Sequence, residues 1–315
     1  PPKLISSLNK MALSRSLSNT ASSLSRYYAK EYPFETVWKL FGDPCREVNY
    51  VFITNGNPFW KRSMSFKSVD QFKQSVMENL PQVIHFGAIY DRVPSDPLRV
   101  VVKKELIFDI DLNDYHLTKE AVGRPGEFNV RMCCGSEKKA CSKCWTLIRF
   151  GARFLYLMLT KMLGFDPNDL RFVFSGRRGM HCIVFDDRAR EFTEKQRQDL
   201  LNFFSRESAK HLEYPIVNEL YETVALPLLK TFLSMHPESL KTSFYEHIEE
   251  NKRRRIPYPE ATPTLMLFWP RFDQKMTTQL VHPFKGPYSL HPETHNICEF
   301  FDPQSDYDPF LALQK

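Results

Sequence analysis

The stretch that decides the fold is Glu105-Leu106-Ile107-Phe108-Asp109-Ile110-Asp111-Leu112. Its alternation predicts a β-strand, because successive side chains of a strand point to opposite faces of a sheet. One face carries Leu106, Phe108, Ile110 and Leu112, and the other carries Glu105, Ile107, Asp109 and Asp111. The apolar face predicts a buried sheet, so the two aspartates should project side by side from its opposite surface.

The aspartate pair suits a divalent cation. Asp109 and Asp111 offer hard oxygen donors, which Mg²⁺ and Mn²⁺ prefer together with phosphate oxygens. Two such ions about 4 Å apart activate an attacking hydroxyl and stabilise a leaving pyrophosphate. The alternative is a solvated strand face, although burying paired acids without a cation is costly. From this motif alone, both interpretations stay open.

A second group of polar residues is Ser175-Gly176-Arg177-Arg178-Gly179-Met180-His181, between apolar segments expected to be strands at 171–174 and 181–185. The glycines allow a tight turn, and the arginines can fork onto phosphate oxygens. The serine hydroxyl and the imidazole add further donors. We favour a cradle for a triphosphate over the alternative, a plain hairpin turn with solvated arginines.

Four of the seven cysteines lie close together, as Cys133-Cys134 and Cys141-x-x-Cys144. Cys-x-x-Cys presents two thiolates to one tetrahedral ion, and a nearby pair completes a structural zinc site. Buried thiols or a redox dithiol are the alternatives, but the lysines around this segment favour an exposed loop. The odd total and the clustering indicate a reducing compartment and a metal site.

Composition sets broader limits. The chain has 315 residues, 42% of them hydrophobic, and a formal net charge of +6, which is compatible with a nucleic-acid partner without requiring one. The longest apolar stretch, 145–163, is interrupted by three basic residues and predicts a helix, not a membrane span. Residues 1–24 form a basic, serine-rich segment, which we expect to be a disordered tail; a mitochondrial transit sequence is the alternative.

The order of expected elements predicts a mixed α/β fold of the α+β class. Residues 47–66 should form two strands joined at Asn55-Gly56, a strong hairpin signal. Ser68 and Thr193, each followed three residues later by a glutamine, should begin helices. A helical insertion is expected at 191–255, a proline-rich linker at 256–263 and an apolar strand at 264–269. The catalytic core would then comprise 25–190 and 256–303, followed by a tail at 304–315.

Taken together, these groups resemble one family, the archaeo-eukaryotic primases, and most closely the eukaryotic-type small catalytic subunit. The resemblance lies in segments that follow one another in family order over residues 25 to 303. They are Tyr27-Tyr28 before Tyr32-Pro33, Gly87-Ala88-Ile89-Tyr90, Phe108-Asp109-Ile110-Asp111, the four cysteines with Trp145, Ser175 to Cys182, Pro270-Arg271-Phe272-Asp273, and Lys285 followed by Ser289-Leu290-His291-Pro292.

The resemblance implies a function and a set of site residues. It makes Asp273 the third catalytic carboxylate beside Asp109 and Asp111. It places the incoming nucleotide among Ser175, Arg177, Arg178, His181, Lys285 and His291. It implies a primase catalytic core with an inserted α-helical subdomain and a small zinc knuckle. His85 stands where relatives often carry an acid near the ribose, which leaves the choice of sugar open.

The activity implied is de novo RNA primer synthesis from ribonucleoside triphosphates on single-stranded DNA, with Mg²⁺ or Mn²⁺ as catalytic ions. The expected partners are an iron–sulfur primase large subunit, in a heterodimer, and the DNA polymerase alpha complex. The expected compartment is the nucleus rather than the mitochondrion. The alternatives are a primase-polymerase that uses deoxynucleotides in repair or in an organelle, and a catalytically silent, zinc-bearing nucleic-acid-binding subunit.

Overall fold

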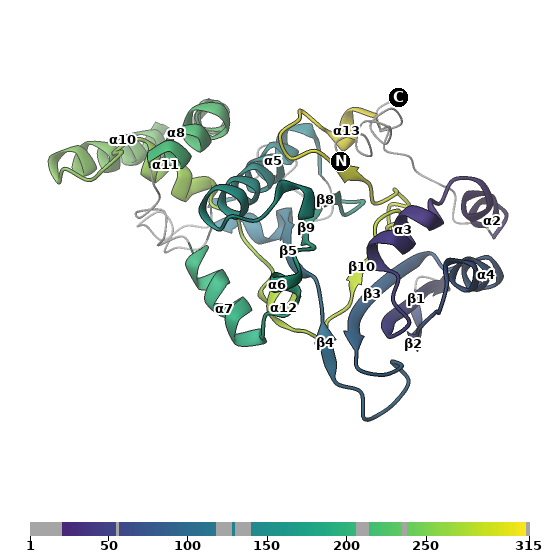
Figure 1. Ribbon diagram of the computed structural model, residues 1–315. Helices are drawn as coiled ribbons and strands as arrows, with labels where there is room; N and C mark the ends of the chain where they lie inside the picture. The colour runs from purple at the N-terminus through teal and green to yellow at the C-terminus, as the bar shows by residue number, and fades with distance from the viewer. Residues whose placement is uncertain are drawn as a thin grey trace.

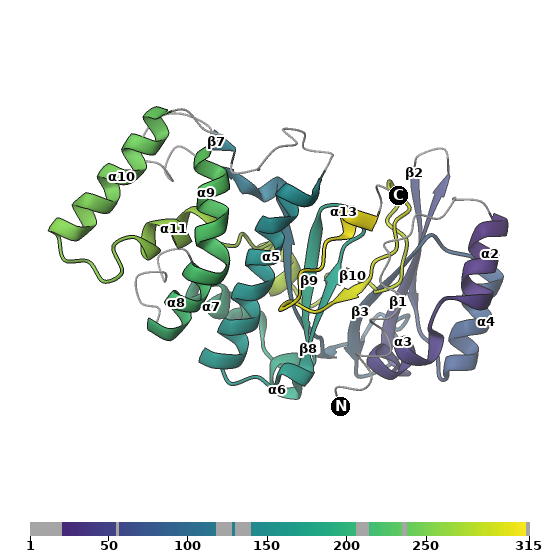
Figure 2. The same ribbon diagram turned by 90° about the horizontal axis from the view of Figure 1, so that it is seen from above.

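The computed structural model describes residues 21–54, 57–117, 128–129, 140–205, 214–234 and 238–312. In this part of the chain, two larger antiparallel sheets, a two-stranded one and the helices around them form a mixed α/β fold of the α+β class, as predicted (Figure 1). The two sheets lie side by side between α5 on one flank and α2 and α4 on the other (Figure 2). None of the helices described is both long and apolar enough to cross a membrane.

The first sheet has the strand order β10-β3-β1-β2, with β4 paired to β3. Its strands are β1 (Arg46–Thr54), β2 (Asn57–Met64), β3 (Val83–Tyr90), β4 (Val101–Lys103) and β10 (Phe284–Lys285). β1 and β2 pair antiparallel up to Thr54 and Asn57, which confirms the hairpin, although Asn55 and Gly56 lie outside the described residues. Residues of α2 (Ala21–Lys30), α3 (Phe34–Phe41) and α4 (Val69–Asn79) share a buried cluster with one face of this sheet.

Both predicted helix starts are confirmed. The Ser68 hydroxyl accepts a hydrogen bond from the Gln71 amide at 3.3 Å and begins α4. Thr193 begins α7 (Glu194–Phe203) with a complete capping box, in which Gln196 bonds back to the Thr193 amide. These side chains satisfy amides that the first helical turn leaves without partners.

The second sheet has the order β11-β8-β9-β5. Its strands are β5 (Leu106–Asp111), β8 (Leu170–Phe174), β9 (Gly179–Val184) and β11 (Phe300–Phe301). The apolar face of β5 packs in one cluster with α5 (Ser142–Leu157), whereas Ile107 belongs to a second cluster with residues of α2 and α3. The predicted alternation of β5 is therefore confirmed, and β5 lies at the edge of its sheet.

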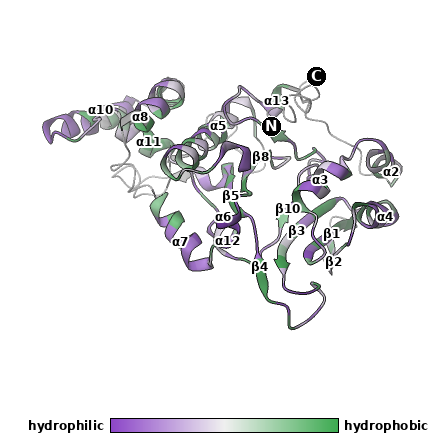
Figure 3. Cartoon of the chain, in the orientation of Figure 1, coloured by the Kyte–Doolittle hydropathy of each residue, from purple (hydrophilic) through white to green (hydrophobic). Residues whose placement is uncertain are grey.

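A helical region follows the second sheet. It contains α7, α8 (Tyr214–Leu220), α9 (Leu226–Ser234), α10 (Glu238–Arg253) and α11 (Ala261–Phe268). Hydrophilic residues dominate α10, at the outer side of the molecule (Figure 3). The remaining elements described are β6 (His116–Leu117), β7 (Phe128–Asn129), α6 (Asp187–Arg190), α12 (Gln274–Thr278), α13 (Pro309–Ala312), the 3₁₀ turns Leu112–Tyr115 and Pro167–Asp169, and the π-helical turns Met158–Met162 and Tyr221–Ala225.

The predicted strand at 264–269 is wrong, because these residues belong mostly to α11, which begins inside the predicted linker. The Thr264 hydroxyl donates to the Glu260 carbonyl at 2.8 Å, a bond typical of a helix. Almost every α11 side chain is buried, so the helix lacks a polar face that would reveal its period. A short apolar run of this kind fits a strand or a buried helix equally well.

A buried ion pair joins the two sheets. Glu105, just before β5, binds Arg46 of β1 through two hydrogen bonds of 2.6 and 2.7 Å. Both side chains are almost completely buried, with 0% and 2% exposed. Arg190 of α6 approaches the same carboxylate at 3.3 Å. The start of the aspartate strand is thereby fixed to the first sheet.

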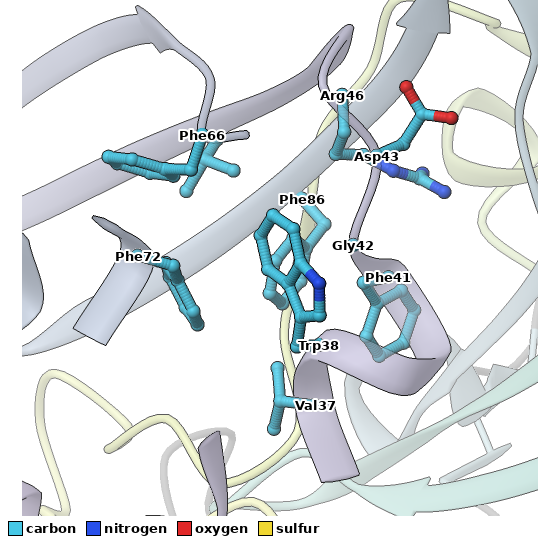
Figure 4. Close-up of a pocket in the computed structure, with 10 residues that line it drawn as sticks. Val37, Trp38, Phe41, Gly42, Asp43, Arg46, Phe66, Phe72 and Phe86 are labelled. Atoms are coloured by element: carbon cyan, nitrogen blue, oxygen red, sulfur yellow. The ribbon is translucent and has the colours of Figure 1, made fainter. Parts of the chain in front are cut away.

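A small hollow lies between α3 and the first sheet, away from the aspartates. Figure 4 shows Trp38, Phe41 and Phe86 around it, and its volume is about 10 Å³. A cavity of that size has room for about one water molecule. We therefore regard it as a packing gap and not as a ligand site.

Candidate active site

Three predicted acids lie near one another at the edge of the second sheet. Asp109 and Asp111 project from β5 with 20% and 34% of their side chains exposed. The Asp273 amide donates to the Asp109 carbonyl at 3.0 Å, which brings a distant segment against this strand. The Asp273 carboxylate also caps α12, since it accepts from the amides of Lys275 and Met276. The structure thus brings the segment of Asp273 against the strand of Asp109 and Asp111, although no three acids of the described residues stand close enough to form a finished metal site.

Asp114 is an acid that sequence reasoning missed. It lies on the 3₁₀ turn after β5. Burial raises the pKa of Asp114, and the charges of Asp111, Asp109 and Asp273 raise it further. Negative charge is therefore concentrated here, as expected of a place that attracts cations. Its signal in the sequence was the spacing from the other two acids, Asp-x-Asp-x-x-Asp.

Basic groups of β9 and the loop before it face the acids. In the ladder between β5 and β9, Asp109 pairs with His181 and Asp111 pairs with Gly179. His181 Nε2 lies 3.6 Å from an Asp109 carboxylate oxygen. Arg178 Nε lies 2.6 Å from an Asp111 oxygen. Side chains directly opposite each other on paired strands are close neighbours, so the pairing of β5 with β9 places His181 beside Asp109. Arg178 reaches Asp111 from the position just before β9.

The segment from Ser175 to Gly179 is a hairpin turn with donors on it. The Ser175 amide donates to the Gly179 carbonyl at 2.9 Å, and the Gly179 amide donates to the Ser175 hydroxyl at 3.1 Å. A β-carbon on Gly179 would lie 2.6 Å from the Ile110 carbonyl oxygen. The loop is therefore a hairpin turn that lies tightly against the aspartate strand. The same turn that connects β8 to β9 also carries Ser175, Arg177 and Arg178.

Two further segments complete the basic region. The Lys285 ammonium donates to the Ser175 carbonyl. Arg177 forms a 2.8 Å ion pair with Glu293. The His291 ring nitrogen Nδ1 accepts from the Glu293 amide at 3.2 Å. The six residues predicted to bind the nucleotide thus lie on β9, the loop before it, β10 and the segment after β10. They are Ser175, Arg177, Arg178, His181, Lys285 and His291.

The pKa values of the nearby histidines reflect the charges around them. Burial lowers the pKa of His291 to about 2, with further lowering by Lys285, Arg177 and Arg178. Burial also lowers the pKa of His282, and Lys104 adds to this, while Asp273 and Asp109 oppose it. His282 was not predicted as a site residue. It lies near the acids because the segment after α12 runs back toward them, and no local sequence pattern shows this. The site therefore has an acidic side and a basic side in contact, as an anionic nucleotide with cations would require.

Comparison with known proteins now identifies the family. The model of the DNA primase small subunit family matches residues 108–303, which include every candidate site residue except His85. The chain belongs to this family. The DNA primase small subunit of Saccharomyces cerevisiae is 25% identical over 89% of this chain and 80% of its own length. That of Caenorhabditis elegans is 31% identical over 57% of this chain and 43% of its own length. That of Drosophila melanogaster is 24% identical over 80% of this chain and 68% of its own length.

Two of the four predicted zinc ligands, Cys133 and Cys134, lie outside the residues that the structure describes. Cys141 stands at the N-cap of α5, and Cys144 is buried in its first turn. Within the ranges described, no three His, Cys, Asp or Glu side chains stand close enough to hold a metal ion. At the acidic side, Asp111 is engaged with Arg178, and Asp273 with its own helix. Zinc binding stays a prediction.

Proposed function

We propose that the chain starts DNA replication by synthesising RNA primers de novo on single-stranded DNA. In the proposed reaction, the 3′-hydroxyl of one ribonucleotide attacks the α-phosphate of the next, and pyrophosphate leaves. One observation carries the proposal: the Asp273 amide bonds to the Asp109 carbonyl, so three carboxylates lie beside a loop rich in phosphate-binding groups. Membership of the DNA primase small subunit family supports it.

The chain's own residues would act by position and charge. Arg177, Arg178 and Lys285 neutralise the triphosphate, and Ser175, His181 and His291 orient the phosphates and the sugar. Such preorganised donors are worth most where charge develops in the transition state. Binding of the phosphates would also draw Arg178 away from Asp111 and Arg177 away from Glu293, because a phosphate competes for each guanidinium.

Asp109, Asp111 and Asp273 would hold two Mg²⁺ or Mn²⁺ ions. The donor set fits in its chemistry, since carboxylate oxygens are the ligands these ions prefer. After burial, the charges of Asp111, Asp109 and Asp273 raise the pKa of Asp114 further, and bound cations would relieve this repulsion between acids. When bound, the ions supply activation of the hydroxyl and neutralisation of the leaving group. Asp111 joins this set once Arg178 turns to the substrate.

The remaining assignments rest on the family. A zinc ion on Cys133, Cys134, Cys141 and Cys144 would be structural, because four thiolates leave no open position. The relatives are named small subunits, which supports a heterodimer with a primase large subunit carrying an iron–sulfur cluster. We also propose transfer of the primer to the DNA polymerase alpha complex, and location in the nucleus.

One observation favours a second candidate, a primase-polymerase that uses deoxynucleotides. His85, on β3 beside Lys285, is an imidazole with a pKa lowered to about 3 by burial and by Lys285 and other cations. A neutral imidazole makes a weaker contact with a ribose hydroxyl than an ionised carboxylate does. Weaker selection against deoxyribose is the expected consequence.

The test is primer synthesis by the purified chain on an oligo-dT template with ATP and Mg²⁺ or Mn²⁺, repeated with dATP. The Asp109→Ala/Asp111→Ala variant should make no product, and Asp70→Ala, which removes an exposed carboxylate from α4, should behave like the unmodified chain. Short oligoadenylates from ATP support the RNA primase. Preferential use of dATP supports the second candidate. No synthesis, even with a large subunit present, supports a silent nucleic-acid-binding subunit.

A further inference from the structure

The first sheet has a face turned away from α4 that carries aromatic and basic side chains beside the active site. Trp60 and Arg62 of β2 lie on it, together with His85 of β3. The neighbouring residue Lys61 points the other way, since its ammonium donates to Asn79 at the end of α4 at 3.1 Å. Alternate side chains of β2 thus lie on opposite faces of the sheet.

These side chains are in contact with one another. The Trp60 and His85 rings meet edge to face, with centroids 5.0 Å apart and planes at 78°. The Arg62 guanidinium carbon lies 4.2 Å from the Trp60 ring centroid, so the cation is stacked on the indole. His85 pairs across the sheet with Lys285, which bonds to Ser175. The group is therefore continuous with the proposed nucleotide site.

The charge of this group is positive and exposed. Arg62 is exposed, and among the described residues it has no salt-bridge partner within 4 Å. His85 stays neutral at physiological pH, because burial, and then the charges of Lys285 and Arg62, lower its pKa to about 3. Its Nδ1 atom is buried and has no hydrogen-bond partner among the residues that the structure describes. A buried polar atom without a partner is rare in native proteins.

We propose that Trp60 and Arg62 bind a strand of nucleic acid next to the nucleotide site. The indole and the guanidinium that lies over it both offer planar faces on which a base can stack, and the guanidinium can also donate to a backbone phosphate. Aromatic stacking with a basic residue is the common basis of single-strand binding without sequence preference. The inference that this surface binds nucleic acid does not depend on primer synthesis. Only the identity of the bound strand, template or primer, rests on the proposed function.

The neighbours Arg62 and Lys61 allow a matched test. Arg62→Ala and Lys61→Ala remove the same charge from the same strand, but from opposite faces. Binding of the full chain to a labelled oligo-dT strand, and to a primer–template duplex with a single-stranded overhang, is measured by fluorescence anisotropy without nucleotide. Arg62→Ala should weaken binding about tenfold and lower the salt slope by about one. Lys61→Ala should leave both nearly unchanged.

Trp60 is tested with Trp60→Phe and Trp60→Ala, compared with Phe59→Ala on the other face. Loss of binding in Trp60→Ala with retention in Trp60→Phe supports stacking, and thermal unfolding of each variant shows whether the fold is kept. If Arg62→Ala binds as tightly as Lys61→Ala, the inference is overturned. A defect confined to the duplex identifies the primer strand, whereas a defect on oligo-dT alone identifies the template.

The two proposals fail separately. If the unmodified chain makes no primer but Arg62→Ala still loses binding, the proposed activity fails and the binding surface stands. If primers are made and Arg62→Ala changes neither binding nor the KM for the template, the activity stands and the binding surface fails.

Discussion

Glu105→Gln removes a buried negative charge while it keeps the size of the side chain. The Glu105 carboxylate accepts two short hydrogen bonds from Arg46 and lies 3.3 Å from Arg190. The amide of Gln offers one acceptor oxygen where the carboxylate had two, so a guanidinium stays buried with an incomplete set of partners. Breaking one side of a buried ion pair costs about 3–5 kcal/mol. We expect a loss of that size in the free energy of unfolding.

Urea unfolding followed by circular dichroism at pH 7 measures this loss. Asp91→Asn is the matched control, because its ion pair with Arg92 lies at the surface, and we expect no measurable change there. The double replacement Arg46→Met/Glu105→Leu should restore much of the stability, since an apolar pair often replaces a buried ion pair without cost. Arg190 would keep its contact with Asp187.

The ion pair of Glu105 with Arg46 also predicts that the free energy of unfolding depends on pH. Burial alone would raise the pKa of Glu105, but the charges and hydrogen bonds of Arg46, and the charge of Arg190, lower it below its ordinary value of 4.5. The stabilisation is therefore complete above about pH 4.5 and is lost as the pH falls through the lower value of the folded state. A Glu105→Gln chain as stable as Asp91→Asn at pH 7 would refute the reasoning.

Three other predictions follow from the site and its supports. Burial, and then the charge of Arg197, lower the pKa of Lys104 from 10.5 to about 7. Between pH 7 and pH 10.5 the unfolded chain therefore binds more protons than the folded one, and the free energy of unfolding rises by at most about 1.4 kcal/mol per pH unit. Lys104→Met should abolish that rise, which urea unfolding at pH 7, 8 and 9 measures; a persistent rise would contradict the assignment. Gly176→Ala places a β-carbon 2.7 Å from that of His291 at a φ of 88°, so it should cost about 1–2 kcal/mol of stability and raise the KM for ATP; an unchanged KM would separate the loop from the nucleotide. Cys141→Ser/Cys144→Ser should lower the zinc content measured by mass spectrometry, whereas Cys45→Ser should not; full zinc in the double variant would exclude these ligands.

The sequence predicted those parts of the fold that depend on local chemistry. The alternation around Asp109 and the caps at Ser68 and Thr193 were predicted correctly, because each depends on residues a few positions apart. The strand predicted at 264–269 failed, because a fully buried helix carries no polar period to identify it.

The candidate site could be predicted only in part. Asp109 and Asp111 follow from strand geometry, but Asp273 came from the resemblance, since its contact with Asp109 depends on how the chain returns after a long helical region. The contacts of Glu105 with Arg46, of Lys104 with the Gln279 carbonyl and of Trp60 with His85 join residues that are distant in sequence. No local pattern encodes such pairings, and each involves residues that look ordinary in isolation.

The helical region is attached to the core at closely spaced points. At its entrance, the Glu194 carboxylate of α7 accepts from the Leu280 amide at 3.0 Å, just beyond α12. Lys104, next to the aspartate strand, bonds to the Gln279 carbonyl at the end of the same helix. These bonds hold the start of the helical region next to the segment that follows Asp273. The length of the helical region can therefore change in evolution without moving the Asp273 carboxylate. The entropy of closing such an excursion grows only slowly with its length. Members of the family could therefore acquire or lose helices here while the arrangement of the acids is preserved.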